Sequence, residues 1–252
     1  MLSISQSFLI VFASVASALV FMVLLNRVWS PESRRVNNDV IGWHLGMLGT
    51  TYAVVLGFML YAVWIDFGTA DANVDAEANA LVNVYLLANG LPSPQRELLK
   101  SQTRSYADAV VNREWPLMQE NKLPKESHQI GQSMWETLMA IKSPTPAEAV
   151  AQDHALYELS AMTEHRRTRW LESTSRLPTV LWCVLIMGGI LTIASSCTFG
   201  STSVRVHGLQ VFAFSLLISL VLVAIADIDR PFQGSVHVGM SAFQRAQQDM
   251  QQ

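Results

Sequence analysis

The sequence predicts an all-α, polytopic membrane protein with four spans and a helical soluble domain between spans 2 and 3. Three observations favour this fold class. Hydrophobic residues make up 50% of the 252 residues and charged residues only 15%, whereas a soluble domain typically carries about 25% charged residues. Four apolar runs are each about 20 residues long, the length that a helix needs to cross the hydrocarbon core. The polar stretch between the second and third runs has the periodicity of helices.

The predicted spans divide the chain into four parts. Residues 1–66 form an N-terminal transmembrane hairpin with spans at about 7–26 and 42–65, and residues 178–228 form a C-terminal hairpin with spans at about 179–199 and 208–226. Residues 67–177 form the helical soluble domain, and residues 229–252 form a tail. Because the number of spans is even, both termini and the soluble domain lie on the same side of the membrane.

The second span is expected to continue into the soluble domain as one helix, because no proline separates it from the acidic, alanine-rich segment that follows. Four acidic residues lie on this continuation: Asp66, Asp71, Asp75 and Glu77. Two interpretations remain open for them. They form a solvated helix face, or they form an acidic vestibule around a symmetry axis that attracts cations.

One narrow face of the second span carries small residues at helical spacing: Gly42, Gly46, Gly49, Ala53 and Gly57. Large residues on the roughly opposite face, Tyr52 and Leu56 among them, are expected to contact lipid. A stripe of small residues allows another helix to approach closely, or it forms a narrow axial surface in an oligomer. Thr50, Val54 and Phe58 flank this stripe and are candidates for an apolar pore constriction.

The soluble domain is expected to contain three further helices. The first is capped by Ser93, with Pro94 at its first position, and ends at Pro116. The second covers about residues 126–141. The third begins with a capping box formed by Thr145 and Glu148 and continues to about Arg176. A basic cluster near its end, Arg166 to Arg169, is interpreted as solvated and close to the membrane. A weak strand-like alternation occurs at residues 235–238.

Composition and motifs exclude several functions. The net charge of −3 gives no basic surface for nucleic acid. Cys183 and Cys197 are 14 positions apart in one apolar run and cannot bridge within that helix. His154 and His165 have no neighbours that complete a metal site. No phosphate loop or hydrolase motif is present, so we expect no enzyme activity, no catalytic residue, no metal and no cofactor.

Basic residues give the orientation. Four lie in the short connections, Arg27, Arg34, Arg35 and Arg205, whereas six lie near the membrane on the other side: Arg166, Arg167, Arg169, Arg176, Arg230 and Arg245. The positive-inside rule therefore places the soluble domain and both termini in the cytoplasm.

Five segments in order, from about residue 42 to residue 243, are similar to the bestrophin-like family: YAVVLGFMLYAVW, EANALVNVYLLANGLP, YADAVVNREWPLM, RLPTVLWCVLIMGG and DIDRPFQGSVHV. Bestrophins are pentameric anion channels with four spans per subunit. The resemblance therefore implies a homo-oligomer, a pentamer by resemblance, with a pore neck on the second span. The neck positions would be Thr50, Val54 and Phe58.

The sequence departs from the bestrophin pattern after Arg230-Pro231-Phe232. The next residues, Gln233 to Val236, contain no acidic run, so the resemblance does not imply a calcium clasp. The acidic residues after the second span also favour cations, so anion selectivity is not carried over.

Two functions from different classes remain. The leading hypothesis is a homo-oligomeric channel for small inorganic ions in the inner membrane of a bacterium, with the second spans around the pore. The alternative is a non-conducting membrane scaffold or sensor whose helical domain binds a partner. In that case the glycine stripe serves packing alone.

Overall fold

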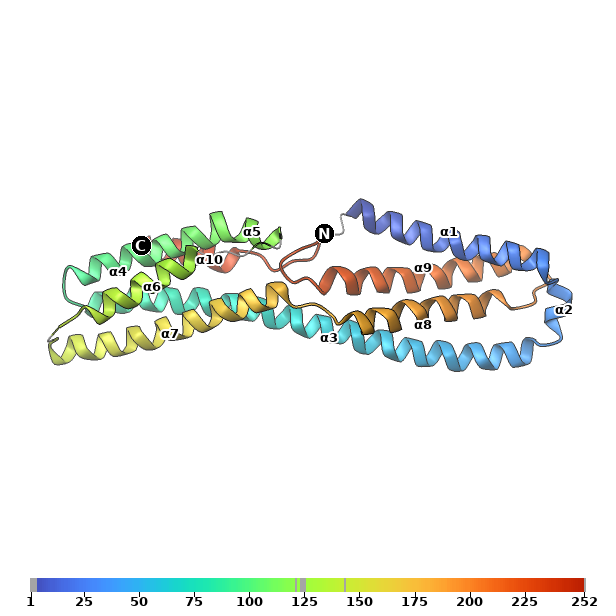
Figure 1. Cartoon of the computed structure of the whole chain (residues 1–252), viewed down its shortest axis with the longest axis horizontal. Helices are drawn as coiled ribbons and strands as arrows, with labels where there is room; N and C mark the ends of the chain where they lie inside the picture. The colour runs from blue at the N-terminus through green and yellow to red at the C-terminus, as the bar shows by residue number, and fades with distance from the viewer. Residues whose placement is uncertain (1–3, 121, 123–125, 143, 252) are drawn as a thin grey trace. The chain divides into compact units, whose positions relative to one another are not determined.

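In the computed structural model, residues 4–120, 122, 126–142 and 144–251 are described, and their regular structure is entirely helical (Figure 1). The long helices are α1 (Ile4–Val28), α3 (Asn38–Leu87), α7 (Pro146–Thr174), α8 (Thr179–Cys197) and α9 (Val204–Ile228). The shorter elements are α2 (Pro31–Arg35), η1 (Ala88–Gly90), α4 (Gln95–Ala109), η2 (Val110–Glu114), α5 (Trp115–Gln119), α6 (Glu126–Met139) and α10 (Ser241–Asp249). Among the described residues no strand forms, and residues 235–238 are irregular.

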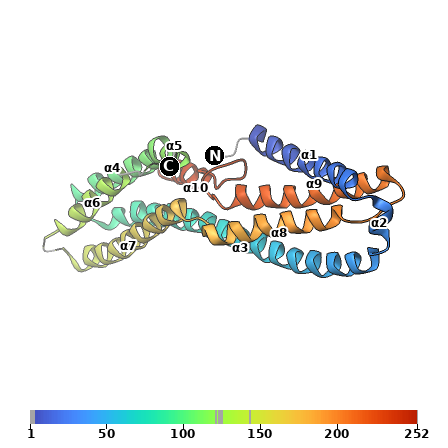
Figure 2. The ribbon, with the colours of Figure 1, turned by 45° about the vertical axis from the view of Figure 1, so that its right-hand side comes forward.

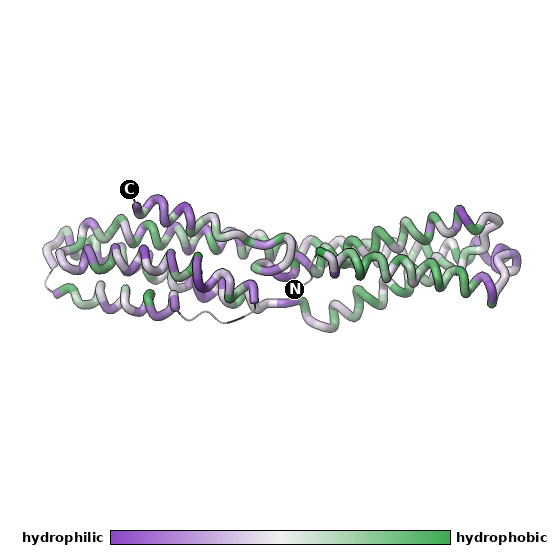
Figure 3. Tube along the Cα trace, turned by 90° about the horizontal axis from the view of Figure 1, so that it is seen from above, coloured by the Kyte–Doolittle hydropathy of each residue, from purple (hydrophilic) through white to green (hydrophobic). Residues whose placement is uncertain are grey.

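The chain divides into two compact units. The membrane unit comprises residues 1–65 and 176–229, and the soluble unit comprises residues 66–175 and 230–252. Four described helices, α1, α3, α8 and α9, are long and apolar enough to cross a membrane, and hydrophobic residues dominate the membrane unit (Figure 3). The expected all-α, four-span fold class is therefore confirmed, and α3 is the predicted continuous helix, with 50 residues that belong to both units.

The core of the membrane unit is built from α3, α8 and α9, and α1 lies beside α9 in two views (Figures 1 and 2). Tyr52 and Leu56 on α3 are buried against Leu185 of α8 and Ile218 of α9. The expectation that Tyr52 and Leu56 face lipid is therefore wrong. The hydroxyl of Tyr52 donates to the carbonyl of Leu185 at 2.7 Å, which satisfies a polar group inside the bundle rather than in hydrocarbon.

Two glycines of α8 make room for this tyrosine. A Cβ atom on Gly188 would lie 2.6 Å from the ring of Tyr52, and one on Gly189 would lie 3.0 Å from its hydroxyl. These glycines are therefore required by packing within one chain.

The connection between α1 and α3 ties the two transmembrane hairpins together. Arg34 is buried and donates to the carbonyl of Cys197 at 2.8 Å, near the end of α8, and to the side chain of Asn26. The side chain of Asn38 exchanges two hydrogen bonds of 2.9 Å with the backbone of Gly200. A Cβ on Gly200 would lie 2.5 Å from the backbone of this connection, so the contact requires glycine.

The core of the soluble unit includes the residues predicted as a tail. Phe232 and Phe243 are buried with Leu81 of α3, Tyr106 of α4 and Leu159 of α7. Apolar burial is the dominant stabilising term in folding, so the C-terminal segment is an integral part of this unit.

The helix ends agree only partly with the sequence patterns. The capping box is present: the backbone N–H of Thr145 donates to Glu148 at 2.8 Å, and the backbone N–H of Glu148 donates back to the Thr145 hydroxyl at 3.3 Å. Ser93 is not a cap, because α4 begins at Gln95 without a side-chain cap. Pro116 does not end its helix. The chain passes through the π-helical turn η2, and Pro116 lies in the first turn of α5, where a missing N–H is tolerated.

Candidate functional site

The three candidate constriction residues lie on an exposed face of α3. Thr50, Val54 and Phe58 are each four positions apart, and Val54 and Phe58 are 52% and 70% exposed. This face is roughly opposite the face that buries Tyr52 and Leu56. The subunit therefore uses one side of α3 for its own packing and leaves the other side uncovered.

The stripe of small residues is also uncovered by this chain. A Cβ atom added to Gly46, Gly49 or Gly57 would have no other atom within 4 Å, and one on Gly42 would only touch Phe199 at 3.4 Å. The stripe lines two adjoining, largely apolar cavities of ≈ 530 and ≈ 280 Å³ between α3 and the helices α8 and α9, with Gly49 and Phe214 in both. Unlike Gly188 and Gly189, Gly46, Gly49 and Gly57 therefore have room for a larger side chain within this chain.

The four acidic residues do not lie together on one exposed face. Asp66, Asp71 and Asp75 are exposed, and Asp75 pairs with Arg245 of α10 at 2.9 Å. Glu77 is fully buried. Its assignment to an acidic vestibule is therefore wrong, because its carboxylate forms an ion pair in the core.

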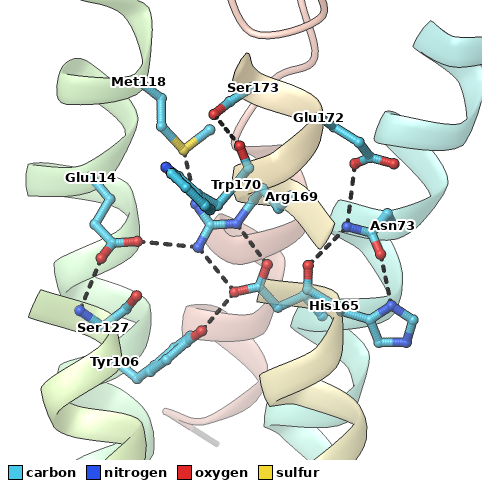
Figure 4. A network of polar contacts seen from close by, with 11 residues as sticks. Asn73, Tyr106, Glu114, Met118, Ser127, His165, Arg169, Trp170, Glu172 and Ser173 are labelled. Atoms are coloured by element: carbon cyan, nitrogen blue, oxygen red, sulfur yellow. Dashed lines mark hydrogen bonds and ion pairs between the residues drawn. The ribbon is translucent and has the colours of Figure 1, made fainter. Parts of the chain in front are cut away.

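Glu77 belongs to a buried polar network (Figure 4). The guanidinium of Arg169 on α7 donates to both carboxylate oxygens of Glu77, at 2.6 and 3.0 Å, and to Glu114 at 3.1 Å. The hydroxyl of Tyr106 donates to Glu77 at 2.6 Å, and the backbone N–H of Ser127 donates to Glu114 at 2.9 Å. The network therefore joins α3, α4, η2, α6 and α7.

Contacts within the network stabilise the ionisation states of its members. Burial lowers the pKa of Arg169, but the charge and hydrogen bonds of Glu77, together with the charges of Tyr106 and Glu114, outweigh it and the pKa is raised overall. Burial, and after it the charge of Glu77, raises the pKa of Tyr106 well above its ordinary value, so this hydroxyl stays a donor. The guanidinium also lies 5.8 Å from the ring centroid of Trp115 and donates to the sulfur of Met118.

The interpretation of Arg169 as part of a solvated cluster is therefore also wrong. A pattern in the sequence could have shown this. Glu77 continues the buried row Ala70, Val74, Leu81 and Val84 on α3. Arg169 likewise continues the buried row Ala155, Leu159 and Met162 on α7. Each charge thus falls on the apolar face of its helix, which indicates a buried pair.

A second polar cluster lies between α3 and α7. The side-chain amide of Asn73 donates to the backbone carbonyl of His165 at 2.9 Å and to Glu172 at 3.4 Å, and its oxygen lies 2.7 Å from Nδ1 of His165. Burial, and in addition the charge of Asp66, raises the pKa of Glu172 to about 7. In the described part of the chain, no three potential ligands are placed to hold a metal ion.

Four apolar helices, one of which extends into a helical soluble unit, define a polytopic α-helical membrane protein. The bestrophin-like domain matches residues 12–243, and the chain belongs to the bestrophin-like family. The family predicted from the sequence is thereby confirmed.

The fold has a counterpart among solved structures. A crystal structure of a membrane protein is similar to this chain with a TM-score of 0.69 and 12% sequence identity, over 95% of this chain and 97% of the other. At this identity the likeness shows the fold alone. No curated protein matches the sequence.

Proposed function

We propose that the protein is a homo-oligomeric channel that passes small inorganic ions passively, with α3 of each copy lining the pore. One observation carries this proposal. The helix buries Tyr52 and Leu56 in its own subunit and leaves the opposite face, with Thr50, Val54 and Phe58, uncovered. Membership of the bestrophin-like family supports the same reading. The proposed constriction is apolar, so ions pass through it only while it is filled with water.

The glycine stripe supports assembly. Glycine in a helix costs about 1 kcal/mol relative to alanine, and no neighbour within the chain excludes a Cβ atom at Gly46, Gly49 or Gly57. Small residues on a membrane helix allow another helix to approach its backbone closely. A second copy of this chain, packed on the stripe, would place the adjacent face of α3 toward the axis of a ring.

The exposed acidic residues favour cations near one mouth of this pore. Asp66 and Asp71 are exposed on α3, and Asp75 shares its charge with Arg245. We propose that the protein lies in the inner membrane of a bacterium, and the balance of basic residues supports a cytoplasmic soluble unit. The proposed activity needs no cofactor.

Reconstitution into liposomes and planar bilayers tests the proposal. We expect unitary currents under gradients of chloride, sodium or potassium, and Phe58→Ala should change their amplitude, because it removes the largest side chain of the constriction. Phe12→Ala is the matched control, since Phe12 on α1 is 72% exposed and Phe58 is 70% exposed. Sealed vesicles with a verified oligomer and no flux would instead support the scaffold.

Neutralising the exposed aspartates tests the charge of the mouth. In the proposed channel, Asp66→Asn with Asp71→Asn lowers the local cation concentration and shifts the reversal potential toward anions. Asp153→Asn, an exposed carboxylate on α7, is the control and should leave it unchanged. Equal reversal potentials in the wild type, the double variant and the control would indicate that the aspartates only form a solvated helix face.

A further inference from the structure

Helix α4 carries a row of three basic residues without ionic partners. Arg96, Lys100 and Arg104 are four positions apart, so they lie on the same side of the helix. Lys100 donates to the side-chain oxygen of Asn89 at 2.6 Å, and Arg104 donates to the hydroxyl of Tyr85 at 2.6 Å. Arg96 donates to a backbone carbonyl at 2.9 Å. No described residue forms a salt bridge with any of the three, so the row presents positive charge to a partner.

The first part of α7 has the opposite character. Residues 146–164 contain no lysine or arginine and several carboxylates, Glu148 and Glu164 among them. Tyr157 in this stretch is 73% exposed, more than any other large hydrophobic residue in the described part of the soluble unit. Val150, two turns away on the same side of the helix, is 58% exposed. An exposed tyrosine on an acidic helix suits a cationic partner, because an ammonium or guanidinium group binds the face of an aromatic ring.

The two helices lie on opposite sides of the soluble unit, with α3 and α6 between them (Figures 1 and 2). On the remaining side of α3, Ala72, Asn79 and Leu86 are exposed. With this side of α3 toward the axis of a ring, α4 of one copy faces α7 of the next copy. A basic face and an acidic face on opposite sides of one subunit suit such a head-to-tail contact, since each copy offers one face to each neighbour.

The basic row and the exposed tyrosine also lie at the same level along α3. On the α7 side, a Cβ atom on Gly90 would lie 2.6 Å from Ala151, and Glu158 accepts from Asn83 at 3.1 Å. On the α4 side, Lys100 and Arg104 bond to residues 89 and 85. Residues 151–158 and 100–104 are therefore both placed beside residues 83–90. Rotation about an axis along α3 keeps this level, so the two faces of neighbouring copies can meet.

We propose that the soluble units of neighbouring copies bind each other through Tyr157 of one copy and the basic row of the next, with the ring against Lys100 and Arg104. Both cations already lie over the ring of Tyr85 in their own chain, at 5.0 and 5.1 Å from its centroid. Arg104 is exposed, so its guanidinium has a second face for a second ring. This contact rests on the proposed homo-oligomer and adds the surface that joins its soluble units.

Cross-linking of the full-length protein in proteoliposomes tests the contact. Lys100→Cys and Tyr157→Cys are placed in separate copies of a chain in which Cys183 and Cys197 are alanine, and the two copies are co-expressed. A short bifunctional maleimide should join the copies into dimers in the mixture, and in neither chain alone. The control pairs Tyr157→Cys with Met139→Cys, an equally accessible position on α6 that is 62% exposed, and should give no dimer.

A charge exchange tests the same contact without a reagent. Lys100→Glu should weaken association about tenfold, because it places a carboxylate against an acidic helix. Tyr157→Lys should weaken it similarly, because it sets one cation against two. The two changes in one chain should restore association, since every contact then joins opposite charges again. Tyr157→Phe keeps the ring and should associate like the wild type. Dilution of the oligomer in mild detergent measures these effects.

The outcomes separate this contact from the proposed channel. An oligomeric wild type that gives no dimer in the mixed cross-linking, or a charge exchange that associates no better than its single variants, would overturn the contact and leave the channel standing. A wild type that is monomeric in the membrane would overturn both. An oligomer that has the contact but passes no ions would overturn the channel alone.

Discussion

Arg169 contacts residues from four other helical elements of the soluble unit, α3, η2, α5 and α10, and each of these contacts is buried. Its guanidinium pairs with Glu77 of α3 and Glu114 of η2, and it lies over the rings of Trp115 and Phe243. Removing one partner of a buried ion pair leaves an uncompensated charge in the core. Single substitutions in this network therefore have a much larger effect than substitutions in surface ion pairs.

We expect Arg169→Met to lower the free energy of unfolding by about 3–5 kcal/mol, because Glu77 and Glu114 both lose the guanidinium with which they pair. The control is Arg245→Met, which breaks the exposed pair with Asp75 and should cost about 0–1 kcal/mol. Thermal unfolding in detergent compares the two. Similar losses in both variants would show that the buried pair has no special role.

Glu172 gives a pH-dependent stability with a defined sign. Its pKa is raised from 4.5 to about 7 by burial and by Asp66, so the folded protein binds this proton more tightly than the unfolded chain. The ionised carboxylate therefore destabilises the fold increasingly as the pH rises from 4.5 through about 7.

Glu172→Gln should accordingly raise the unfolding temperature at pH 8 and leave it unchanged at pH 4. The gain at pH 8 is on the order of 1 kcal/mol once solvent screening is allowed for. Glu158→Gln is the control, since Glu158 on the same helix also accepts from an asparagine, Asn83, at 3.1 Å. The same difference from wild type at both pH values would contradict the assignment.

At the scale of helices, the glycines of the membrane unit fall into two groups. Gly188 and Gly189 admit Tyr52, whereas a Cβ atom added at Gly46, Gly49 or Gly57 would meet no other atom within 4 Å. The first group acts on folding, and we propose that the second acts on assembly, since close helix approach in a membrane depends on small residues.

Substitution by alanine should have a different effect in each of the two groups. Gly188→Ala should destabilise the single subunit, because its Cβ would lie 2.6 Å from the ring of Tyr52. Gly46→Ala combined with Gly49→Ala should keep the subunit folded and weaken association about tenfold. Unfolding and oligomer dissociation in mild detergent measure the two effects. Unchanged association would assign the stripe to lipid contact.

The sequence predicted the helices better than their ends. Long apolar runs and the pair Thr145 and Glu148 have local signatures, so the spans and the start of α7 were correctly expected. The continuation of the helix through Pro116 was not expected. It depends on the π turn η2, which places Glu114 beside Arg169, a residue 55 positions away in the sequence. The buried role of Glu77 was missed for a similar reason, since its partner is 92 positions away.

At the scale of the whole molecule, the proposed channel requires several copies of α3 to surround an aqueous axis. The face with Thr50, Val54 and Phe58 is exposed in one subunit, and exposure alone does not distinguish contact with water from contact with lipid. A charged reagent does distinguish them, because it reacts with thiols in water and does not enter hydrocarbon.

The most direct test is therefore the reactivity of single cysteines in proteoliposomes. Thr50→Cys, Val54→Cys and Phe58→Cys are compared with Phe12→Cys after both native cysteines, Cys183 and Cys197, are replaced by alanine. In the proposed channel, a charged, membrane-impermeant thiol reagent modifies the three α3 positions rapidly and reduces ion flux, while Phe12→Cys reacts slowly and the flux is unchanged. Reaction at the three positions no faster than at Phe12→Cys would contradict it.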